Sequence, residues 1–225
     1  MLKKMPPFFL LQPAKADLMW HDLKRFAVIT RGYAENMKDG IYGPVPSSFR
    51  DPLKELWSMA AYELLYIENV MVLTKLDLRQ TGFSKEAVPV KNIVDHGKTF
   101  IEPILAQKKI RLAINHQDGT IETNARYIVL ILENLLFVAA NLPKVSRCAL
   151  RINAKKRELL LECNPQKKIA IPKGLFSRTN LFTPAEHPLV RHSLFLVTAK
   201  MLAARLGASL VITSGKTLQF RLRYA

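Results

Sequence analysis

An apolar pattern that runs without a break over residues 53–78 constrains the fold of this chain more than any other feature. Apolar residues and one threonine follow one another at alternating spacings of four and three: Leu53, Trp57, Ala60, Leu64, Ile67, Met71, Thr74 and Leu78. This spacing places them all on one side of an α-helix and is typical of a coiled-coil seam. Asp51 and Pro52 mark the helix start, because an N-cap residue is followed by proline at the first helical position.

A second long helix is predicted just before this one, over residues 14–38. One side of it carries a mostly apolar stripe, made of Met19, Leu23, Phe26, Thr30, Tyr33 and Met37. Glycines and prolines within residues 40–46 then predict a loop, so the two helices form an antiparallel hairpin. In a lone hairpin Trp57, Leu64 and Met71 would face water, and the sequence therefore predicts a dimeric four-helix bundle.

The remainder of the chain is predicted to form an α/β sandwich. Helices are expected over 92–107, 124–141 and 189–206, and strands over 110–114, 121–123, 147–152, 158–163, 209–213 and 218–223. This order fits helices on one face of a mixed sheet. We therefore expect an α+β chain with a tail (1–13), a helical hairpin (14–82) and a sandwich (83–225).

The two predicted units differ sharply in charge. The 225-residue chain has a net charge of +16. Residues 1–90 hold 12 Lys or Arg and 10 Asp or Glu, a net of +2, whereas residues 91–225 hold 22 and 8, a net of +14. A basic surface suits an acidic protein, an anionic membrane surface or nucleic acid. Nucleic acid is not favoured, because no stretch interleaves aromatic with basic residues and no zinc-finger or basic-zipper spacing occurs.

Other features bear on location and metals. No apolar run approaches the roughly 18 residues of a membrane span, and the first residues lack the pattern of a signal peptide. Cys148 and Cys163 are too few for a disulfide framework or a metal cluster, and no histidines stand with carboxylates at zinc-ligand spacing. We expect a cytoplasmic protein that has no membrane partner and no bound metal.

His21 is the residue of the hairpin best suited to chemistry. It lies on the polar side of the first helix, which it shares with Lys24, Val28 and Arg31. The carboxylate of Asp22 can hold one ring nitrogen as a donor and leave the other nucleophilic. Val28 is the apolar residue in this polar stripe, where a docking partner could cover it. The alternative is an ordinary solvated histidine.

Residues 21–26, His-Asp-Leu-Lys-Arg-Phe, resemble the H-box helix of sensor histidine kinases, usually His-Glu-Leu-Arg-Thr-Pro-Leu. Residues 39–44 and 73–77 resemble the loop after that helix and the end of the second helix. The resemblance implies that His21 is the phosphoacceptor and the next residue its adjacent acid. Arg25 replaces the Thr or Asn that supports phosphatase activity in the family, and Phe26 replaces the proline, so the resemblance does not extend to that activity.

The second unit resembles the ATP-binding domain of the same kinases. Residues 132–139 resemble its N-box, and residues 193–200 resemble the segment that begins its last helix. The box that recognises adenine is missing, because no glycine lies between Thr120 and Lys173.

Four positions of the resembling segments form a degenerate nucleotide site. Asn134 keeps the first N-box asparagine, but the second, a magnesium ligand in the family, is Val138. Valine offers no ligand atom to a hard cation. Two glycines that approach the phosphates in the family are Ser193 and Phe195 here, and a phenylalanine ring stands where backbone must come close. The resemblance therefore implies that ATP is not bound.

A phosphoacceptor beside a degenerate ATP site suggests a histidine phosphotransfer protein of a two-component phosphorelay. It would pass a phosphoryl group between receiver-domain aspartates through His21, and it would need no cofactor, because the magnesium belongs to the receiver. The expected partners are a second copy of the chain, response regulator receiver domains and a histidine kinase. The alternative is a non-catalytic pseudokinase scaffold or inhibitor that binds a histidine kinase or response regulator.

Overall fold

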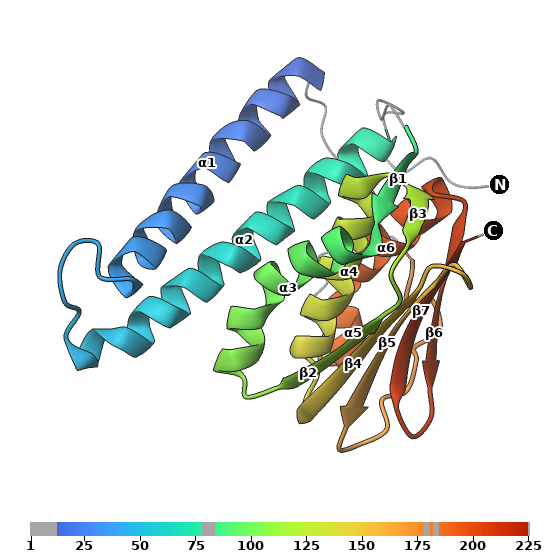
Figure 1. The fold of residues 1–225 in the computed structure, drawn as a ribbon. Coiled ribbons are helices and arrows are strands. Elements are labelled where there is room, and N and C mark those ends of the chain that lie inside the picture. Colours follow the sequence, from blue (N-terminus) through green and yellow to red (C-terminus); the bar gives the residue numbers. More distant parts are fainter. Residues whose placement is uncertain (1–12, 78–83, 178–180, 182–184, 225) are drawn as a thin grey trace. The chain divides into compact units, whose positions relative to one another are not determined.

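The computed structural model describes residues 13–77, 84–177, 181 and 185–224. The chain divides into two compact units, Met1–Gly82 and Phe83–Ala225. The first unit contains the long helices α1 (Pro13–Lys38) and α2 (Arg50–Asp77), with the short 3-10 helix η1 (Ser47–Phe49) before α2. Figure 1 shows α1 and α2 side by side in antiparallel directions. The predicted helical hairpin is confirmed.

Small side chains allow the two helices to pack closely. The buried residues of α1 follow one another at heptad spacing, and those of α2 include two adjacent alanines: Trp20, Ala27 and Ala34 on α1, and Trp57, Ala60, Ala61 and Leu65 on α2. Alanine also has the highest helix propensity of all residues. The alanine-rich faces therefore stabilise both the helices and their contact.

The apolar stripe predicted for the first helix lies on the exposed surface of α1. Phe26 is 71% exposed and Tyr33 is 55% exposed, and α2 also exposes Met59. The expectation that Trp57 faces water in a single hairpin is wrong, because this side chain is buried and the guanidinium of Arg31 lies 4.9 Å above its ring. The exposed apolar surface of the hairpin therefore includes Phe26, Tyr33 and Met59, and it does not include Trp57 of the predicted seam.

The second unit holds seven strands and four helices in the described part of the chain. The strands are β1 (Glu86–Pro89), β2 (Arg111–His116), β3 (Thr120–Thr123), β4 (Val145–Asn153), β5 (Glu158–Pro165), β6 (Ala208–Ser214) and β7 (Leu218–Tyr224). The helices are α3 (Val90–Gln107), α4 (Ala125–Ala140), α5 (Pro188–Arg191) and α6 (Ser193–Arg205).

Five strands form a mixed sheet in the order β2-β4-β5-β7-β6. The β2–β4 pair is parallel, and the other three pairs are antiparallel. Figure 1 shows α3, α4 and α6 together on one face of this sheet. Alternate residues of the strands face these helices and are buried, among them Leu150, Ile152, Leu161, Phe220 and Leu222. The predicted α/β sandwich is confirmed, and its other face carries the polar residues of each strand.

Two details of this unit differ from the sequence-based expectation. β1 was not predicted; it pairs with β3 as a separate two-stranded sheet, and its four residues are too few for a clear alternation. The helix expected over 189–206 is divided into α5 and α6. His187 caps α5 by accepting a hydrogen bond from the Leu189 N–H at 3.3 Å, and His192 stands between the helices with a non-helical ψ of 23°. At this break the His192 ring packs against Phe137 and Phe195.

Candidate functional site

The helix α1 holds His21 fully accessible on its surface. The side chain is 76% exposed, and its Nδ1 lies 3.7 Å from Oδ1 of Asp22, which is 61% exposed. This distance is longer than a hydrogen bond. The structure places no partner at the other ring nitrogen, Nε2, among the described residues. The imidazole can therefore present Nε2 to a partner molecule while a carboxylate lies beside Nδ1.

The residues predicted to dock a partner follow His21 along α1 at helical spacing. Val28 is 49% exposed and offers an apolar contact. Lys24 donates a hydrogen bond from Nζ to Glu68 of α2 at 3.1 Å, and Arg31 covers the ring of Trp57. These two cations thus border the hairpin interior, a role that sequence reasoning missed because both contacts reach across to the other helix.

The residues predicted to correspond to the N-box lie on α4 and are fully buried. Asn134 and Val138 are both 0% exposed, one helical turn apart. Asn124 begins the helix, because its side chain accepts a hydrogen bond from the Tyr127 N–H at 3.1 Å. A valine at position 138 supplies no oxygen or nitrogen ligand to a cation. Of these two residues, only Asn134 has a polar side chain.

The start of α6 places in the core the other two residues predicted to form a degenerate nucleotide site. Ser193 and Phe195 are each 2% exposed. The ring of Phe195 lies 4.8 Å from that of Phe137 on α4 and 6.2 Å from the imidazole of His192, between centroids. These are distances at which aromatic rings attract one another. The structure therefore joins α4 to the start of α6 through an aromatic cluster of Phe137, His192 and Phe195.

Burial and two nearby cations keep His192 uncharged at neutral pH. Burial, together with the nearby cations of Arg191 and Lys108, lowers the pKa of His192 to about 4. The ring is therefore neutral at pH 7 and packs against Phe137 edge-on, with 5.8 Å between centroids. Sequence reasoning treated this histidine as unremarkable, and only its neighbour in sequence, the cationic residue 191, hinted at a depressed pKa.

The described residues contain no group of three or more His, Cys, Asp or Glu placed to hold a metal ion. Within the same ranges, no helix combines the length and the hydropathy that crossing a bilayer requires.

Comparisons with known proteins identify the fold. No family model and no curated protein matches this sequence. Among solved structures, the histidine kinase AdeS of Acinetobacter baumannii has a TM-score of 0.57 at 16% identity, over 91% of this chain and 97% of the other. The cytoplasmic segment of the histidine kinase QseC has a TM-score of 0.55 at 11% identity, over 74% of this chain and 93% of the other.

A third structure covers both units of the chain. Full-length ShkA in complex with AMPPNP has a TM-score of 0.59 at 15% identity, over 94% of this chain and 45% of the other. At such identities the likeness is one of fold. The chain is therefore histidine-kinase-like in fold, with a helical hairpin followed by an α/β domain of the histidine kinase ATPase type.

Proposed function

We propose that this chain is a histidine phosphotransfer protein of a two-component phosphorelay, with His21 as the phosphoacceptor. The observation that carries the proposal is the exposure of His21 on the hairpin of a histidine-kinase-like fold, next to Asp22. A role in two-component signalling fits the fold, and the exposed imidazole supplies the nucleophile that such a relay needs.

The proposed step transfers a phosphoryl group from a receiver-domain aspartyl phosphate. The lone pair of His21 Nε2 attacks phosphorus, a P–N bond forms, and the P–O bond to the aspartate breaks to release its carboxylate. The ring becomes a cation as the bond forms, and the carboxylate of Asp22, 3.7 Å from Nδ1, stabilises that charge. A second receiver aspartate then reverses the step. The magnesium ion belongs to the receiver in both steps.

We also propose that the chain works without ATP. Three features of the α/β domain support this part of the proposal. Val138 has no ligand atom for magnesium, and the ring of Phe195 packs against that of Phe137. Both Val138 and Phe195 are buried. A nucleotide phosphate needs exposed backbone N–H groups at a helix start. The burial of Ser193 and Phe195 at the start of α6 disfavours such a contact, so the proposed relay does not use ATP.

The partners proposed are a second copy of the chain and receiver domains, with a histidine kinase as a further candidate. Exposed apolar side chains on both helices, such as Phe26 and Met59, support a homodimer through the hairpin. Val28, on the same side of α1 as His21, supports docking of a receiver there. Because the QseC match is to a cytoplasmic segment, we propose the cytoplasm as the location.

The test is transfer of radiolabelled phosphoryl groups from a purified phosphorylated receiver domain to this chain. The label should be acid-labile, as a phosphoimidazole is. His21→Ala should reduce transfer by at least about a hundredfold, because no other group takes the bond to phosphorus. Asp22→Ala should slow transfer by about tenfold, because it removes charge stabilisation without removing the nucleophile.

A third variant separates docking from chemistry. Val28→Asp should weaken receiver binding while leaving His21 intact, because it places a charge in an apolar contact. Label that still reaches the chain in His21→Ala would refute the assignment of the phosphoacceptor. A wild-type chain that binds the receiver but takes no label, with His21→Ala binding equally well, would instead establish the scaffold function.

A further inference from the structure

The open face of the five-stranded sheet carries more basic than acidic side chains. Its outward-pointing charged residues are Arg111 on β2, Arg147 and Arg151 on β4, Glu158 and Glu162 on β5, and Arg221 and Arg223 on β7. Both acids are already paired within the sheet. Glu158 lies 2.7 Å from Nε of Arg223 and 3.7 Å from Nε of Arg221, and Glu162 lies 2.8 Å from Arg151. The two acids therefore compensate the positive charge of Arg151, Arg221 and Arg223 only.

The positive charge at the β2–β4 edge of the sheet is not compensated by these acids. Arg111 and Arg147 stand directly opposite each other in the parallel pairing, and like charges in this position destabilise a sheet. Both are exposed, and neither has an ion-pair partner in the part of the chain that the structure describes. Lys216, in the turn between β6 and β7, is likewise exposed and has none among the described residues. An anionic partner would relieve the repulsion between Arg111 and Arg147 and pair with Lys216.

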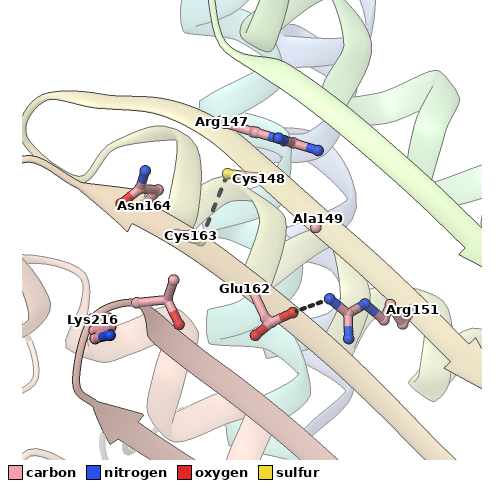
Figure 2. A pocket seen from close by; sticks show the side chains of 9 residues that line it. Arg147, Cys148, Ala149, Arg151, Glu162, Cys163, Asn164 and Lys216 are labelled. Atoms are coloured by element: carbon pink, nitrogen blue, oxygen red, sulfur yellow. Dashed lines mark hydrogen bonds and ion pairs between the residues drawn. The ribbon is translucent and has the colours of Figure 1, made fainter.

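A hollow of about 440 Å³ lies on this face between the basic residues. Figure 2 shows Arg147 and Arg151 on one side of it, Lys216 on the other, and Glu162 between them. Ala149 lines the hollow and pairs with Ala113 on β2, so that small side chains leave space between the arginines. Glu162 is held in place, because it also accepts a hydrogen bond from Gln219 at 2.9 Å.

We propose that this hollow binds an acidic segment of a partner protein, whose Asp and Glu side chains pair with Arg147 and Lys216. The hollow is of the size of ordinary ligand sites, and an arginine fork binds carboxylates in two-point geometry. Its lining holds no aromatic side chain on which a nucleotide base could stack, so protein carboxylates suit it better than a nucleic acid does. Glu162 is already paired with Arg151, so Arg147 and Lys216 are the cations available to an incoming carboxylate.

This inference is independent of phosphotransfer through His21, because His21 belongs to the first unit and the hollow to the second. It gives a role to the excess positive charge of the second unit, which the proposed relay does not use.

The test uses the full chain and fluorescein-labelled poly-L-glutamate, with binding measured by fluorescence anisotropy at about 50 mM salt, where exposed charges are weakly screened. The double variant Arg147→Glu/Lys216→Glu should bind at least about tenfold more weakly. The matched control is Lys155→Glu/Lys156→Glu, in the β4–β5 turn, which changes the net charge equally and should bind within about twofold of the wild type.

The melting temperatures of the same variants show whether they are folded. Arg147→Glu places a carboxylate opposite Arg111, so the melting temperature should not fall. Equal loss of binding in both double variants would overturn the proposal, because it would show that only net charge matters. A labelled single-stranded DNA that binds more tightly than poly-L-glutamate, and loses binding only in Arg147→Glu/Lys216→Glu, would also overturn it in favour of a nucleic-acid site.

Discussion

At the scale of single residues, two histidines of the same chain have opposite surroundings. His21 is exposed beside a carboxylate, and His192 is packed between Phe137 and Phe195 with cations nearby. The first is available to a partner, whereas the second is held neutral. The difference comes from neighbours and not from the histidines themselves.

His192 should make stability depend on pH. Its pKa is about 4 in the folded chain against 6.5 as the ordinary value, so the unfolded chain binds more protons between these two values. Stability therefore falls as pH is lowered from 6.5 to 4, and His192 accounts for about 1–3 kcal/mol of that loss.

The measurement is urea unfolding at a series of pH values. His192→Phe removes the titrating group and keeps an aromatic ring in the cluster, so this variant should lose less stability over the same range. An unchanged slope of stability against pH in His192→Phe would contradict the prediction. Fluorescence or circular dichroism can follow the transition.

Cys148 and Cys163 should be inert thiols in the folded chain. They face each other across β4 and β5, with their sulfurs 3.6 Å apart, and each is 1% exposed. The contact with Cys148 and burial raise the pKa of Cys163, which disfavours the reactive thiolate. A thiol reagent such as Ellman's should react slowly with the native chain and titrate both cysteines in urea. Rapid reaction of the native chain would contradict this.

At the scale of elements, the hairpin exposes one apolar side of α1 and buries another. The buried side uses alanines and Trp20, and the exposed side uses Phe26 and Tyr33. Large apolar residues left exposed at helical spacing favour association with a second helix pair. The exposed set, and not the predicted seam, is therefore the better target for disrupting a dimer.

Phe26→Lys should weaken dimerisation by at least about tenfold, because burying a phenylalanine side chain contributes about 1.5–3 kcal/mol. Light scattering over a concentration series measures this directly. Val28→Lys is the matched control, since it adds the same charge to an exposed apolar position two residues on, which a helix places on its opposite side. A wild-type chain that remains monomeric at high micromolar concentration would refute the homodimer.

At the scale of the whole molecule, a hairpin of nearly balanced charge precedes a strongly basic α/β domain. The net charge is +2 over residues 1–90 and +14 over residues 91–225. The domain has a histidine-kinase-like fold, and the four residues predicted to form a degenerate nucleotide site are all buried in it. One fold can host different functions, so the role of this domain depends on the residues that it presents.

The whole chain should show no saturable heat with magnesium and ATP in calorimetry. The physical reason is that Val138 provides no ligand and Phe195 packs against Phe137. Autophosphorylation with labelled ATP should likewise be absent. Saturable binding in the micromolar range would contradict this reading and restore an active kinase as the function.

The sequence by itself determined the order of the elements and the kind of fold. The helical periodicity over residues 14–38 and 53–78 and the alternation in most strands of the sheet are local patterns, and the structure contains these elements. The resemblance to histidine kinases rested on short local motifs too, and the likeness of fold agrees with it. His21 and its adjacent acid were found in the same way, and their role remains a prediction.

Only the tertiary structure decided which surfaces are inside and which charges lie together. A helical pattern does not say that Ala27 and Ala34 are buried while Phe26 is exposed, because the side of α1 that faces α2 is set by how the two helices pack together. Nor does the sequence reveal that Arg111 stands opposite Arg147 or that Phe195 meets Phe137. Strand register and helix packing join residues distant in sequence, so no local pattern records those contacts.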